Sequence, residues 1–103
     1  MEIVPGIHKI EGIRGVNCYL VINGDRLVVI DAGLPGQAKA TVNYIRKLGE
    51  KPEAVRCIIL THADIDHVGS ALELREMTGA KVAIHSGDVP ILTGRQKFKT
   101  INN

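Results

Sequence analysis

Two histidines and two aspartates fall within six consecutive residues of this chain: His62, Asp64, Asp66 and His67. They directly follow the apolar run of residues 57–60, which has the character of a buried strand. Neutral imidazole nitrogen and ionised carboxylate oxygen suit Zn²⁺, Fe or Mn better than Ca²⁺ or Cu⁺. The pattern therefore predicts a metal-binding loop at the end of a strand.

The spacing of these four residues allows two neighbouring metal positions. In an extended segment, alternate residues point the same way, so His62 and Asp64 can converge, while Asp66 and His67 stand at the turn into a helix. A catalytic metal takes about three protein ligands and keeps a position open for water, and a second metal would lie ~3.5–4 Å away. Four candidate ligands supply some of the donors for each of two metal ions, but they are too few to complete the coordination of both. The alternative interpretation makes Asp64 and Asp66 ordinary loop and helix-start residues, because a carboxylate is favourable at a helix N-terminus.

Hydrophobic periodicity and turn signals indicate the elements that would present this loop. Asn23-Gly24-Asp25 predicts a hairpin, Gly49 and Gly79 predict helix ends, and Ser70 to Glu73 matches a capping box. We expect a short helical turn at residues 86–92. The expected strands are residues 3–4, 7–10, 16–22, 27–30, 55–60 and 81–85, and the expected helices are 37–48 and 70–78.

This order of elements predicts an α/β (α+β) fold with a mixed sheet and its helices on one face. Residues 27–30, 57–60 and 82–84 are apolar at successive positions, which is typical of strands covered on both faces. Two helices can cover one face, so the second needs a further layer or a partner, and a homodimer is one candidate. We expect residues 1–93 to form the domain portion and residues 94–103 to be a tail or linker.

Composition limits the class of protein. Thirteen Lys and Arg against eleven Asp and Glu give a net charge of +2, so we do not expect nucleic acid as a partner. No run reaches the ~18 apolar residues of a membrane span, and the first residues lack the features of a signal peptide. The expected location is therefore the cytoplasm.

The stretch Thr61-His62-Ala63-Asp64-Ile65-Asp66-His67-Val68-Gly69-Ser70 resembles the metallo-β-lactamase superfamily signature, usually written T-H-x-H-x-D-H-x-G-G. Upstream, Asn17-Cys18-Tyr19-Leu20 and Ile30-Asp31-Ala32-Gly33 resemble two further landmarks of that family. The resemblance covers about residues 3–93. It implies half of an αββα sandwich, with one or two metals, zinc above all, bound between its sheets.

Carried over by position, the resemblance assigns roles to individual residues. His62 would bind the first metal, and Asp66 and His67 the second, with Asp66 also acting catalytically by positioning the nucleophilic water. Asp31 would hydrogen-bond the loop that carries the ligands, although it could equally be a simple turn aspartate.

This sequence departs from the family pattern in two ways. Asp64 stands where the family has its second histidine, which makes the site more anionic and favours iron or manganese alongside zinc. Family members are also about twice as long, and their later half supplies a further histidine, a bridging aspartate and a final histidine that cannot be matched here. We therefore expect the N-terminal half of a hydrolase in which metal-bound hydroxide attacks an ester, thioester, lactam, lactone or phosphodiester. The alternative is a non-catalytic fragment or dimerisation module with a vestigial site.

The remaining histidines and both cysteines are expected to be structural. His85 is the last residue of a predicted strand, and His8 alternates with Ile7 and Lys9, which predicts that His8 faces solvent. Cys18 and Cys57 lie in apolar runs without a CxxC partner, so we expect two buried free thiols rather than a thiolate metal site.

Overall fold

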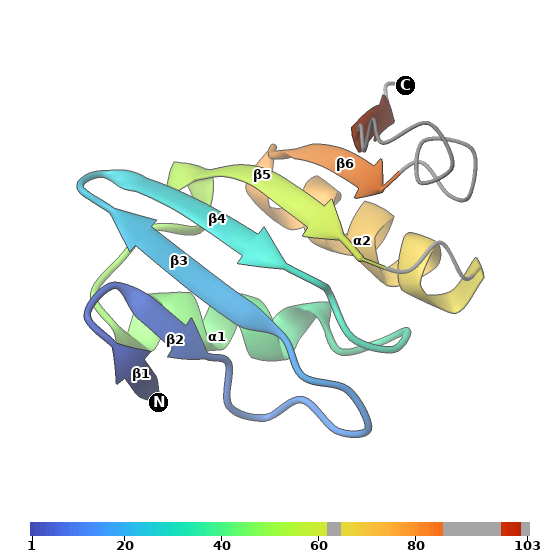
Figure 1. Cartoon of the computed structure of the whole chain (residues 1–103). Helices are drawn as coiled ribbons and strands as arrows, with labels where there is room; N and C mark the ends of the chain where they lie inside the picture. The colour runs from blue at the N-terminus through green and yellow to red at the C-terminus, as the bar shows by residue number, and fades with distance from the viewer. Residues whose placement is uncertain (62–64, 86–97, 102–103) are drawn as a thin grey trace.

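The computed structural model describes residues 1–61, 65–85 and 98–101; for residues 65–67, 85 and 98–101 it gives the course of the backbone. Its strands form one sheet, in which each strand lies beside its neighbour in sequence (Figure 1). Strands β1 to β4 pair antiparallel, β4, β5 and β6 pair parallel, and β7 is antiparallel to β6. The strands are β1 Glu2–Val4, β2 Ile7–Lys9, β3 Tyr19–Asn23, β4 Arg26–Ile30, β5 Val55–Leu60, β6 Lys81–His85 and β7 Phe98–Ile101.

Two α-helices connect the parallel strands. Helix α1 (Ala38–Lys47) and the short 3₁₀ helix η1 (Pro52–Ala54) lead from β4 to β5, and helix α2 (Ile65–Thr78) leads from β5 to β6. Parallel neighbours need such crossovers because the end of one strand and the start of the next lie at opposite edges of the sheet. The mixed sheet with helices on one face is therefore as predicted. None of the described helices is long and apolar enough to cross a membrane.

Local sequence signals account for several element ends. Asn23 pairs with Arg26 across a two-residue loop in which Gly24 has φ +63°, the hairpin predicted from Asn-Gly. Gly49 has φ +81° and donates its amide to Arg46 O, while Glu50 donates to Ile45 O, the paired bonds of a Schellman cap. Gly79, at φ +77°, ends α2 in a similar conformation. Glycine is suited to these positions because it has no Cβ to clash at positive φ.

The hydrophobic core lies between the sheet and the two helices. Alternate residues of the central strands are fully buried there, among them Leu20, Val29 and Ile58, and α2 contributes Ala71 and Leu74. The paired positions Leu20, Val29, Ile58 and Val82 form one row across β3 to β6. Residues paired across a sheet share a face, so this row places both helices on the same side.

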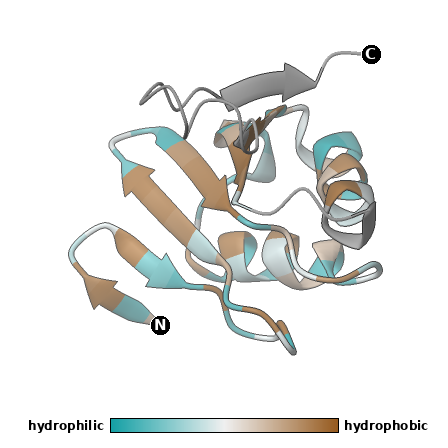
Figure 2. Cartoon of the chain, turned by 45° about the vertical axis from the view of Figure 1, so that its right-hand side comes forward, coloured by the Kyte–Doolittle hydropathy of each residue, from teal (hydrophilic) through white to brown (hydrophobic). Residues whose placement is uncertain are grey.

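The opposite face of the sheet is also apolar but is less covered by the described residues. Strands β3 and β4 are hydrophobic over most of their length (Figure 2). A second row of paired positions crosses β1 to β5, and its members range from half-buried to exposed. It consists of Val4, Ile7, Val21, Val28 and Cys57. Both faces of the sheet therefore carry rows of apolar side chains, as predicted.

His8 does not face solvent as predicted, because it is only 8% exposed. It pairs with buried Leu20, so it lies on the helix side, and its Nδ1 is 3.1 Å from Tyr44 Oη on α1. Ile7 takes the other face, where it pairs with Val21. The prediction was wrong because it assumed that only the face containing Ile7 would be buried.

Helix α2 begins at Ile65, five residues before the predicted start at Ser70. Ser70 therefore lies inside the helix and is not an N-cap. Strand β7 lies within residues 94–103, for which no strand was predicted. The division of the chain at residue 93 stays a prediction, and the helical turn expected at 86–92 lies outside the described residues.

Neighbouring isoleucines of β5 test the difference between the two faces. Ile58 is fully buried under the helices and Ile59 is half-buried on the other face. In the 103-residue chain, Ile58→Ala should lower the free energy of unfolding by roughly 2–5 kcal/mol, and Ile59→Ala by less than about half as much. Urea denaturation measures both. Equal losses would contradict one-sided cover and would show that something also packs on Ile59.

Candidate metal centre

The parallel pairing of β4 and β5 brings the ends of these two strands together. Ile30 pairs with Ile59, and the amide of Asp31 donates to Ile59 O at 2.8 Å. Because both strands run in the same direction, the residues that follow them, Asp31 and Thr61, meet at one edge of the sheet. Ligand sites of open parallel sheets form at this edge.

Asp31 binds Thr61 through both of its carboxylate oxygens. Oδ1 accepts from the Thr61 amide at 2.9 Å, and Oδ2 accepts from Thr61 Oγ1 at 2.8 Å. Asp31 has φ +65° and is the one non-glycine residue in the described part with positive φ. Aspartate tolerates this conformation better than most residues because its short polar side chain can bond locally. Asp31 thus holds the residue directly before His62, while its importance for metal binding stays a prediction.

A second contact joins the segment after β4 to helix α2. Ser70 is 1% exposed, and its hydroxyl donates to the backbone carbonyl of Gly33. The sequence interpretation missed this role because it treated Ser70 as a helix cap. A polar residue between Val68 and Ala71, in what proves to be the helix interior, was the signal that could have revealed it.

The predicted ligands fall on or beside the part of the chain between these two contacts. His62 and Asp64 lie outside the described residues, and Asp66 and His67 belong to the first turn of α2, where the backbone alone is described. No group of three or more His, Cys, Asp or Glu side chains elsewhere in the described part could hold a metal. The donor set of two imidazoles and two carboxylates suits a divalent transition metal.

In the metal-free chain both cysteines hold their protons more tightly than an ordinary thiol does. Both are free thiols, as expected. Burial, reinforced by the charge of Asp31, raises the pKa of Cys18 to about 12. Burial also raises the pKa of Cys57, which is half-buried on the open face. Since a thiol must lose its proton to bind a metal, imidazole and carboxylate remain the better candidate ligands.

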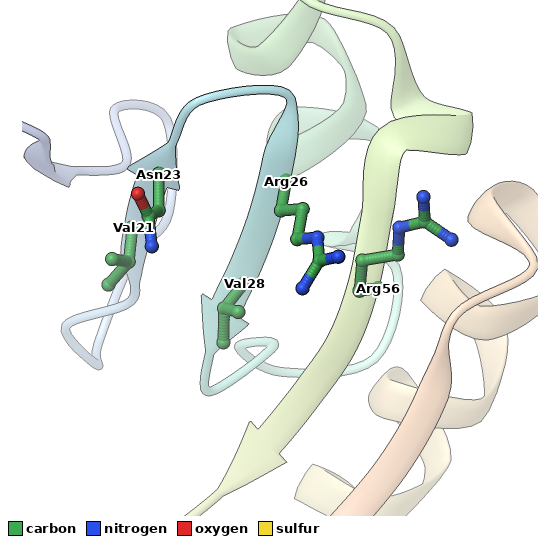
Figure 3. Close-up of a pocket in the computed structure, with 5 residues that line it drawn as sticks. All are labelled: Val21, Asn23, Arg26, Val28 and Arg56. Carbon is green, nitrogen blue, oxygen red and sulfur yellow. The ribbon is translucent and has the colours of Figure 1, made fainter.

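A hollow of about 580 Å³ lies at the other end of the strands (Figure 3). Val21 and Val28 form its apolar part, and Asn23, Arg26 and Arg56 its polar part. Arg26 and Arg56 stand near the starts of β4 and β5, whereas Asp31 and Thr61 follow their ends. The hollow therefore belongs to the open face of the sheet and is separate from the candidate metal loop.

Comparison with known proteins identifies a family. A family model described as the metallo-beta-lactamase superfamily matches residues 12–102. YflN of Bacillus subtilis, described as a probable metallo-hydrolase, is 31% identical over 100 residues, which cover 94% of this chain and 38% of YflN. YobT of the same organism, an uncharacterized protein, is 44% identical over 80 residues, covering 77% of this chain and 33% of YobT.

A solved structure agrees with these relatives. A motif mutant of the Cronobacter sakazakii metallo-beta-lactamase matches with a TM-score of 0.74 and 28% identity, over 91% of this chain and 36% of that one. This chain therefore spans well under half the length of the proteins that it matches.

Substitutions of Asp31 test its hold on Thr61. Asp31→Ala should cost roughly 2–3 kcal/mol of unfolding free energy, because it removes both acceptors and places alanine at positive φ. Asp31→Asn should cost about 1 kcal/mol, since it keeps one acceptor oxygen and tolerates the backbone conformation. Urea denaturation gives these values, with exposed Asp25→Ala as the control, expected within about 0.5 kcal/mol of wild type. An Asp31→Ala loss no larger than that of the control would contradict the assignment.

Proposed function

Because this chain belongs to the metallo-β-lactamase superfamily, we propose that it contributes the N-terminal part of a metal-dependent hydrolase site. The proposed ligands are His62, Asp64, Asp66 and His67, and the proposed reaction is hydrolysis at an electrophilic carbonyl or phosphorus centre. Esters, thioesters, lactams, lactones and phosphodiesters all fit this description.

The observation that carries the proposal is the position of the loop. It leaves the carboxyl end of β5, is held at Thr61 by Asp31, and runs into α2, whose first turn contains Asp66 and His67. Ionisable residues seldom gather at a buried strand end for structural reasons alone, since each must be hydrated or paired. The family match over residues 12–102 supports the same interpretation.

The donor types indicate which metals fit. Two histidines with two aspartates suit zinc, and the carboxylate of Asp64 in place of an imidazole also admits iron or manganese. When bound, such an ion lowers the pKa of water and polarises the bond to be cleaved. Within the chain, His62 and His67 would hold metal. Asp66 would bind metal and would also orient the attacking water by accepting a hydrogen bond from it.

The ligand set within these 103 residues is incomplete for two metals, so we propose that further ligands come from outside them. YflN, a probable metallo-hydrolase, is covered over only 38% of its length. The same missing portion would cover the apolar face that includes Ile7, Val21 and Val28. A second copy of this chain is the alternative source of cover, and it would make the chain a dimerisation module.

Metal binding tests the proposed site directly. Wild-type protein purified and loaded with Zn²⁺, Fe²⁺ or Mn²⁺ should retain metal after dialysis, as measured by elemental analysis. A variant with His62, Asp66 and His67 all changed to Ala should retain little, because most of the donors are gone. His85→Ala is the matched control and should bind as wild type does. Equal metal content in wild type and the triple variant would refute the site.

Light scattering tests how the open face is covered. The isolated 103-residue chain should associate at micromolar concentration, because monomers rarely leave an apolar patch of this kind exposed. Replacing Ile7 and Val21, which pair on that face, with Ser should weaken the association. A chain that is strictly monomeric at these concentrations would count against the homodimer and in favour of cover by the same polypeptide.

A further inference from the structure

We propose that Ser70 is a positioning residue for the candidate metal loop. Its hydroxyl joins α2 to Gly33, and the carboxylate of Asp31 joins Thr61 to the same short segment. Residues 31–33 therefore bond the chain at Thr61, before the candidate loop, and at Ser70, after it. This inference rests on the proposed metal site, because positioning has a function only if the loop binds metal.

The geometry around Ser70 is unusual for a serine inside a helix. Such a hydroxyl commonly bonds a carbonyl of its own helix, four residues back. Ser70 donates to the carbonyl of Gly33, 37 positions earlier in the chain. The contact is buried, so it is protected from competition by water. It connects helix α2 to the segment that follows β4.

Gly33 is a well-fixed acceptor. It has φ +81°, and a Cβ at this position would lie 2.6 Å from Gln37 Oε1 and 3.2 Å from Ile13 Cγ2. Gln37 Oε1 accepts from the Leu34 amide at 2.8 Å, and Gln37 Nε2 donates to Arg14 O at 3.3 Å. The carbonyl that receives the Ser70 hydroxyl therefore belongs to a segment that is itself tied to its surroundings.

The proposed ligands Asp66 and His67 belong to the same helix as Ser70, so a bond that fixes Ser70 also restrains their backbone. Positions 66 and 67 stand four and three residues before Ser70, about one turn of the helix. Burial of Ala71 and Leu74 holds α2 against the sheet, but apolar contacts are not directional. A hydrogen bond weakens steeply when its angle changes. Ser70 thus defines the rotation and the axial position of the helix start.

Thr78 provides a matched control in the same helix. Its hydroxyl is buried, donates within the helix to Leu74 O at 2.9 Å and accepts from the Ala80 amide at 3.2 Å, two turns farther from the loop. Ser70→Ala and Thr78→Val each remove one buried hydroxyl and leave the apolar core in place. A purely structural role for Ser70 predicts that both variants lose stability and that neither changes metal affinity.

The experiment compares wild type, Ser70→Ala and Thr78→Val by titration with Zn²⁺ and with Co²⁺, whose visible spectrum reports coordination geometry. We expect Ser70→Ala to weaken Zn²⁺ affinity roughly tenfold or more and to alter the Co²⁺ spectrum. Thr78→Val should stay within about twofold of wild type, since it lies far from the ligands. Wild-type affinity and spectrum in Ser70→Ala would overturn the proposal, as would equal weakening in both variants.

Amide hydrogen exchange in the metal-free proteins separates this inference from the proposed function. Ser70→Ala should speed exchange at residues 69–72, whose helical acceptors are the carbonyls of residues 65–68, and Thr78→Val should not. Unchanged exchange there in Ser70→Ala would show that Ser70 does not hold the helix start. A wild-type protein that binds neither metal would refute the proposed function, and the exchange comparison would still decide whether the contact restrains α2.

Discussion

The two hydrogen bonds from Thr61 to the carboxylate of Asp31 join the carboxyl ends of two parallel strands. Residues 31 and 61 are brought together by the pairing of β4 with β5. A carboxylate suits the place because it accepts both the amide and the hydroxyl at once. The left-handed conformation of Asp31 brings its oxygens to face the neighbouring strand, and the local strain is small for an aspartate.

The same segment also restrains the chain after the candidate loop. Gly33 receives the hydroxyl of Ser70, so the chain is anchored on both sides of His62 and Asp66 by residues 31–33. Metal sites in proteins depend on outer hydrogen bonds that orient the ligands. In this chain, Asp31 and Gly33 at the end of β4 accept such bonds from Thr61 and Ser70, which stand before and after the proposed ligands.

The two faces of the sheet are unequally covered by the described residues, and this asymmetry bears on the proposed source of further ligands. Leu20, Val29 and Ile58 are buried beneath the helices, whereas Val21 and Val28 on the other face are half-buried. Strands that are apolar on both faces are typical of sheets that are covered from both sides. The hollow beside Arg26 and Arg56 belongs to that second face (Figure 3). One additional layer would both cover this face and supply the remaining ligands.

Local sequence alone determined much of this protein. The hairpin at Asn23, the helix end at Gly49 and the exact extent of β5 follow from turn chemistry and hydrophobic periodicity, which act between near neighbours. The donor atoms that His62 and Asp66 offer could likewise be predicted from residue identity, and their binding of metal stays a prediction.

Tertiary structure decided the rest. Periodicity cannot tell which apolar face of a strand meets the helices, so His8 proved buried against Tyr44 although its neighbours predicted exposure. Nor could spacing show that Ser70 lies within α2 and bonds Gly33, since that contact spans 37 residues and exists only once the strands have paired. Contacts between distant segments depend on how the elements pack, and this information is absent from any local stretch of sequence.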